Sequence, residues 1–121
     1  MRVQKAKEYF LGCQAGKKLN CGQAVVAVFG QDREEYPHLV AEFASYGGGR
    51  APEGECGAYY ALRVMLSRWG QSRHEQVCRE HFVSAAGAIR CADIRRQRKL
   101  SCVGCVEQAA GCLEKISSAT I

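Results

Sequence analysis

The sequence predicts an all-α fold, a single domain built as a bundle of six or seven short helices. Apolar residues recur at spacings of three and four in one segment after another, which is the period of a helix with one buried face. No stretch of strand length alternates between apolar and polar residues. The chain has 121 residues, 47% hydrophobic and 24% charged, which suits one globular domain over residues 1–121 with a modest core.

The first three helices are predicted from their apolar stripes and from the residues at their ends. They span Gln4 to Cys13, Cys21 to about Phe29, and about Pro37 to Ala44. Asn20 has the short polar side chain that caps a helix N-terminus. Gly30 ends the second helix, and Pro37 is tolerated because it stands at the start of the third.

A glycine-rich segment leads into the fourth helix, which is predicted from about Cys56 to Trp69. Gly47, Gly48 and Gly49 can take positive φ and leave room for close approach. Cys56 follows where the loop becomes a helix, among unpaired N–H groups and at the positive end of the helix dipole. We therefore expect the loop to hold one sulfur at a helix start, where a thiolate is favoured.

Three further helices complete the predicted bundle. They run from about Ser72 to Ala86, from Cys91 to Arg96, and from Cys102 to about Ile116. The first of these begins at Ser72 and Glu75, which have the spacing of a capping box. Ser101 is a good N-cap for the last.

Basic residues exceed acidic ones, 17 against 12, which gives a formal net charge of +5. Much of the excess lies in the run Arg95, Arg96, Gln97, Arg98 and Lys99. This run could be a solvated helix face, a docking patch for an acidic partner, or a counter-charge for an anionic cofactor. It contains no interleaved aromatic residue and no base-reading motif, so nucleic-acid binding is not expected.

The cellular compartment of the protein is inferred from the absence of export and membrane signals in the sequence. No apolar run follows the basic residues between Met1 and Lys7, and no uncharged apolar run is long enough for a membrane span. We therefore expect a cytoplasmic protein without a membrane span. In that compartment, eight cysteines indicate thiols, a metal or a cluster rather than disulfides.

Four cysteines stand at predicted helix starts, each directly after a polar residue. They are Cys21, Cys56, Cys91 and Cys102, which follow Asn20, Glu55, Arg90 and Ser101. Four positive helix ends converging on four thiolates would offset the charge of an iron–sulfur cluster or a zinc ion, and their N–H groups would hydrogen-bond the sulfurs. By contrast, Cys13, Cys78 and Cys112 lie on apolar helix faces and are predicted to be small buried hydrophobes.

Cys102 and Cys105 form a CxxC motif at a helix N-terminus, the arrangement used for thiol–disulfide exchange. No βαβ pattern surrounds the motif, so a thioredoxin-like fold is not expected, and the second CxxC of a zinc ribbon is missing. Cys105 could pair with Cys102, ligate a cluster, or simply pack. The histidines, His38, His74 and His81, lie far from the cysteines in sequence and are not predicted to be ligands.

Several segments match a known pattern in order. They are Asn20 to Val25, Gly47 to Gly49, Cys56 to Ala58, Gly87 with Cys91, and Cys102 with Val106, Ala109, Ala110 and Leu113. Through them the chain resembles the C_GCAxxG_C_C family of probable redox-active proteins, named after its cysteine pattern. The resemblance implies redox or electron-transfer activity. The chain departs from the family at Ala61, where the family has glycine, and at Cys105 and Cys112, where similar sequences often carry apolar residues.

The family's four cysteines map onto Cys21, Cys56, Cys91 and Cys102, the same four that stand at helix starts. We therefore expect a small redox protein, an electron carrier or oxidoreductase, in which these cysteines ligate an iron–sulfur cluster. It would exchange electrons with a redox partner protein that the sequence does not identify, and the open glycine loop could pack across a homodimer. Two alternatives remain: a thiol oxidoreductase with Cys102 as attacking thiolate and Cys105 or Cys56 as resolving thiol, and a protein held together by structural zinc.

Overall fold

The computed structural model describes residues 2–12, 19–29, 36–46 and 50–119 of the chain. Over these residues it contains α-helices and no β-strand, which confirms the predicted all-α class. The helices are α1 (Arg2–Leu11), α2 (Cys21–Phe29), α3 (Tyr36–Phe43), α4 (Gly57–Arg68), α5 (Glu75–Ala86), α6 (Cys91–Gln97) and α7 (Cys102–Ala119). Two short 3-10 helices, η1 (Pro52–Gly54) and η2 (Ser72–His74), precede α4 and α5. None of the helices in these ranges is long and apolar enough to cross a membrane.

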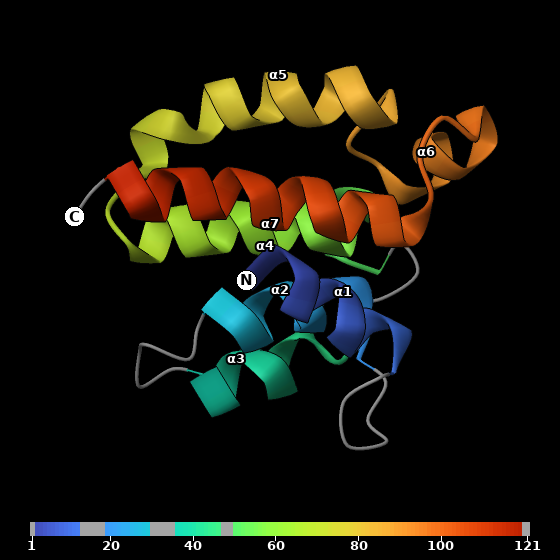
Figure 1. Ribbon diagram of the computed structural model, residues 1–121. Coiled ribbons are helices and arrows are strands. Elements are labelled where there is room, and N and C mark those ends of the chain that lie inside the picture. The colour runs from blue at the N-terminus through green and yellow to red at the C-terminus, as the bar shows by residue number, and fades with distance from the viewer. Residues whose placement is uncertain (1, 13–18, 30–35, 47–49, 120–121) are drawn as a thin grey trace.

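The helices are stacked in layers (Figure 1). α4 and α7 lie side by side in the middle, α5 covers one side of them, and α1, α2 and α3 lie on the other side. α4 and α7 both begin at the end of the bundle where α6 lies, whereas α5 runs in the opposite direction. This arrangement brings several helix N-termini to one end of the molecule.

α2 is buried on all sides over most of its length. It contacts α1, α3, α4 and α7, and every residue from Ala24 to Phe29 is buried. A helix that is apolar all round lies in the interior rather than on the surface. This composition therefore places α2 at the centre of the bundle, with Cys21 as its first residue.

Aromatic contacts join the layers. Tyr59 of α4 packs against Phe82 of α5, with ring centroids 5.2 Å apart. Phe29, the last residue of α2, meets Trp69 at the end of α4 with the rings 6.2 Å apart in an edge-on arrangement. Phe29 thus meets the residue directly after α4, while Cys21 and Gly57, the first residues of the two helices, lie close together at the other end, so the two helices run in the same direction.

Several predicted helix bounds differ from the structure by one to three residues, as α1 begins at Arg2 rather than Gln4, and two of the differences have simple reasons. Ser72 belongs to the 3-10 turn η2, and α5 begins after it without a side-chain cap. α7 continues to Ala119, beyond the predicted end near Ile116, because residues 117–119 include no glycine or proline that would end the helix. Cys13 and the residues 47–49, which also carried predictions, lie outside the described residues.

Candidate functional site

Five cysteines line one cavity of about 450 Å³ at the end of the bundle where α2, α4, α6 and α7 begin. They are Cys21, Cys56, Cys91, Cys102 and Cys105. The first four are the cysteines predicted at helix starts: three are the first residues of α2, α6 and α7, and Cys56 is the N-cap of α4. The predicted placement at helix N-termini is thus confirmed, and the fold brings all four together.

Cys21 is held by a capping box at the start of α2. The side-chain oxygen of Asn20 accepts a hydrogen bond from the backbone N–H of Gln23 at 2.8 Å, and the Gln23 side chain accepts one from the Asn20 N–H at 3.0 Å. The remaining amide groups tie this turn to α3, because Asn20 donates to the Phe43 carbonyl at 2.8 Å and Gln23 donates to the Val40 carbonyl at 2.9 Å. The first turn of α2 is therefore fixed from both sides.

The segments that precede α4 and α6 are paired through their backbones. The Cys56 N–H donates to the Ile89 carbonyl at 2.7 Å, and Glu55 and Arg90 form an isolated antiparallel bridge. This pairing sets the starts of α4 and α6 next to one another. It explains how Cys56 and Cys91, which are distant in sequence, come to line the same cavity.

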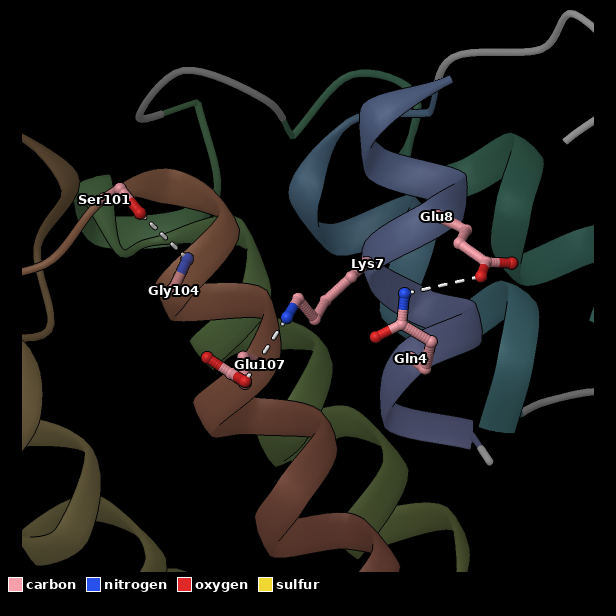
Figure 2. Close-up of polar contacts among 6 residues, drawn as sticks. All are labelled: Gln4, Lys7, Glu8, Ser101, Gly104 and Glu107. Atoms are coloured by element: carbon pink, nitrogen blue, oxygen red, sulfur yellow. Dashed lines mark hydrogen bonds and ion pairs between the residues drawn. The ribbon is translucent and has the colours of Figure 1, made fainter. Parts of the chain in front are cut away.

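The start of α7 is capped as the sequence predicts. The Ser101 side-chain oxygen accepts a hydrogen bond from the Gly104 N–H at 3.1 Å, as Figure 2 shows. Further along the helix, the Lys7 ammonium lies 3.4 Å from a Glu107 carboxylate oxygen and joins α1 to α7. Cys102, the first residue of this capped helix, is exposed.

Two glycines allow the N-termini of α2 and α4 to meet. A Cβ atom on Gly57 would lie 2.8 Å from the Cys21 sulfur and 3.0 Å from the Tyr46 carbonyl oxygen. A Cβ atom on Gly22 would lie 2.8 Å from the Phe43 ring and 3.0 Å from the Gly57 carbonyl oxygen. Real Cβ atoms do not come this close to such groups, so only glycine fits at either position. Each of these glycines directly follows one of the site cysteines.

Three of the cavity thiols are in direct contact. Cys21 is hydrogen-bonded to Cys56, and Cys56 to Cys105. The hydrogen bond with Cys56 and burial raise the pKa of Cys21, while the hydrogen bond with Cys105 and burial raise the pKa of Cys56 to about 12. Burial also raises the pKa of Cys91. These three groups are neutral thiols at physiological pH.

This result corrects the expectation that the helix starts favour thiolates at these positions. Backbone N–H groups do point at the sulfurs as expected, from Ala58 and Gly22 to Cys21 and from Tyr59 to Cys56, and they act to lower the pKa. Burial and neighbouring sulfurs outweigh them, because the low-dielectric interior disfavours a charged thiolate.

Part of the basic run belongs to the cavity wall. Arg95 and Arg98 line the cavity, and the Arg95 guanidinium is hydrogen-bonded to Cys102 with Cys91 nearby. Arg96 instead forms an ion pair with Asp93 on the same helix. Of the three interpretations of the run, the geometry therefore favours a counter-charge role for Arg95 and Arg98. The sequence alone could not distinguish these two arginines from the other basic residues of the run.

The four thiols at helix starts are a donor set that both zinc ions and iron–sulfur clusters use. In the described part of the chain, no group of three or more His, Cys, Asp or Glu side chains is arranged to hold one metal ion. The thiolates around one zinc ion must all lie about 2.3 Å from it. The thiols wall a cavity of about 450 Å³, which leaves space for a bound cluster.

One contact between cysteines lies outside this cavity and was not predicted. Cys78 of α5 is buried, as predicted, but Cys112 of α7 is partly exposed and is hydrogen-bonded to it. Both were predicted to be small buried hydrophobes, which is wrong for Cys112 because it is partly exposed. No local pattern signals their contact, because it depends on how α5 packs on α7.

Comparison of the chain with protein-family models, curated proteins and solved structures found no match.

Proposed function

We propose that the protein is a small redox carrier in which Cys21, Cys56, Cys91 and Cys102 ligate an iron–sulfur cluster. The observation that carries the proposal is that these four thiols, from four different helix starts, line one cavity of about 450 Å³. Four cysteines are the usual ligand set of two-iron and four-iron clusters. The resemblance to the C_GCAxxG_C_C pattern favours the same four residues.

The residues around the thiols have defined roles in this proposal. Once the thiols are deprotonated, the backbone N–H groups of Gly22, Ala58 and Tyr59 stabilise the sulfur charge. The thiols that are neutral without metal release their protons on ligation. Arg95 offsets negative charge on the side of Cys102. When bound, the cluster would supply one-electron redox chemistry.

The apolar residues of the wall limit access of water. Phe10, Ile94 and Leu100 line the cavity together with the cysteines. A less polar, less solvated surrounding is one of the means by which a protein sets the reduction potential of a cluster. We propose that the protein works in the cytoplasm and exchanges electrons with another protein at this end of the bundle, where Cys102 is exposed.

A thiol–disulfide oxidoreductase is the second candidate, and one contact favours it. Cys105 is hydrogen-bonded to Cys56, and Cys102 is exposed one turn away on the same helix. In this function Cys102 attacks a substrate disulfide, and Cys105 or Cys56 resolves the mixed disulfide. The role of Cys105 therefore separates the two candidates.

The test is anaerobic purification of the full chain, followed by visible absorption and by iron, sulfide and zinc analysis of one sample. Brown protein with iron and acid-labile sulfide is the expected result. Cys91→Ser should lose most of the colour and iron, whereas the matched variant Cys105→Ser should keep both. Colourless folded protein with stoichiometric zinc would identify a structural zinc site instead. Colourless, metal-free protein whose exchange activity is abolished by Cys105→Ser would overturn the proposal in favour of the oxidoreductase.

A further inference from the structure

A second cavity of about 340 Å³ lies between α5 and α7. Its wall includes two cysteines, Cys78 from α5 and Cys112 from α7, together with His74, His81 and Lys115. It shares no lining residue with the cysteine cavity at the helix starts. The proposed function makes no use of it.

The two cysteines of this second cavity contact each other but differ in access. Their thiols are hydrogen-bonded across the helix interface. The Cys78 side chain is 4% exposed, whereas Cys112 is partly exposed at the cavity wall. A small molecule that enters the cavity therefore reaches Cys112 first.

The surroundings also distinguish the two sulfurs chemically. The hydrogen bond from Cys78 and the nearby Lys115 ammonium lower the pKa of Cys112 to about 7. The hydrogen bond with Cys112, burial and the Glu75 carboxylate raise the pKa of Cys78. The pair thus consists of one accessible thiolate and one buried thiol in hydrogen-bonding contact, which are the features of an attacking and a resolving cysteine.

We propose that Cys78 and Cys112 form a second redox site, a dithiol that is oxidised by low-molecular-weight disulfides of the glutathione class to a disulfide between α5 and α7. The Cys112 thiolate attacks one sulfur of the small disulfide and forms a mixed disulfide, releasing the first small thiolate. The Cys78 sulfur then attacks Cys112, and its proton passes to the second departing thiolate. Two protein thiols are oxidised and one small disulfide is reduced to two thiols.

The cavity suits this class of reactant. Its volume of about 340 Å³ falls within the range of small-molecule pockets, about 300–1,000 Å³. The wall offers the Lys115 ammonium and two histidine side chains as hydrogen-bond donors to the carboxylates that such peptides carry, and it also contains the Glu107 carboxylate. The inference does not depend on a cluster at the other site.

The experiment uses the reduced full-length protein, incubated anaerobically with glutathione disulfide at neutral pH. Remaining thiols are alkylated in acid-quenched samples, and the products are mapped by mass spectrometry. Trypsin with a glutamate-specific protease releases Cys78 in 76–79 and Cys112 in 108–114, each without another cysteine. The expected product is these two peptides joined by a disulfide.

Single variants test the order of attack. In Cys78→Ser, Cys112 should accumulate as a stable mixed disulfide with glutathione. In Cys112→Ser, Cys78 should remain unmodified, because it is buried and has lost its partner. Circular dichroism checks the fold of each variant, and the wild-type peptide map decides the question if a variant unfolds. Recovery of both peptides as alkylated free thiols, or a disulfide from Cys112 to Cys102 or Cys105, would overturn the proposal.

Discussion

The replacement Gly57→Ala tests how the N-termini of α2 and α4 meet at the cysteine cavity. The added Cβ would lie 2.8 Å from the Cys21 sulfur and 3.0 Å from the Tyr46 carbonyl oxygen. Favourable separations between non-bonded heavy atoms are about 3.5–4.0 Å, so the methyl group intrudes by roughly an ångström. Neither neighbour is the free end of a long side chain, and Cys21 is held by its hydrogen bond with Cys56.

The change in the free energy of unfolding of Gly57→Ala is the sum of two opposing effects. Overpacking of a close contact costs about 1–3 kcal/mol, and replacing glycine by alanine in a helix returns at most about 1 kcal/mol. The free energy of unfolding should therefore fall by about 1–2 kcal/mol. Gly111→Ala is the matched control, because Gly111 lies within α7 and its added Cβ would meet nothing within 4 Å. This control should be stabilised by about 0.5–1 kcal/mol.

Urea unfolding of the reduced, metal-free proteins measures both changes. With a slope of about 1–3 kcal/mol per M of urea for a small domain, the two variants should differ in midpoint by roughly 1 M. Gly57→Ala should also take up less iron than the wild type under the proposed function, because the Cys21 sulfur is displaced. A Gly57→Ala midpoint equal to or above that of the wild type would refute the close approach of the two helices.

Three further predictions concern replacements of Asn20, Arg95 and Cys78. Asn20→Ala should lower the free energy of unfolding by about 1–2 kcal/mol, as measured by urea unfolding, because it removes a cap as well as the bond to α3. Asn20→Ser should recover about half of that loss. Arg95→Gln should lower the reduction potential of the iron-loaded protein in a potentiometric titration, because a positive charge beside the cavity favours the reduced state; the control Arg96→Gln, whose arginine pairs with Asp93, should change it less. Alkylation of Cys112 should rise with pH through a midpoint near 7, and Cys78→Ala should move that midpoint upward because the thiolate loses its hydrogen-bond donor. An unchanged midpoint in Cys78→Ala would show that the two sulfurs are not in contact.

Local signals predicted the parts of the site that local structure builds. Asn20 and Ser101 have the side chains of N-caps, and both cap their helices in the structure. The cysteine that follows each of them is therefore at a helix start. The contact between Cys56 and Cys105 was not predicted, because the CxxC motif suggested Cys102 as the neighbour of Cys105. Cys105 contacts Cys56 because α4 and α7 lie side by side.

The pairing of Cys78 with Cys112 was missed for the same reason. Each residue lies on the apolar face of its own helix, and nothing in either segment indicates which helix will face it. The contact is created by the packing of α5 on α7. A disulfide or dithiol between two helices cannot be assigned from cysteine positions alone.

The periodicity of apolar residues was enough to determine the helical class, and the capping residues Asn20 and Ser101 were enough to place Cys21 and Cys102 at helix starts. Both depend on interactions within a few residues of the chain. The convergence of the four cysteines and the protonation of their sulfurs were decided by the tertiary structure. Helix N-termini favour thiolates, but the pKa of Cys56 is nevertheless raised to about 12, because desolvation and contact with another sulfur depend on which helices pack around it.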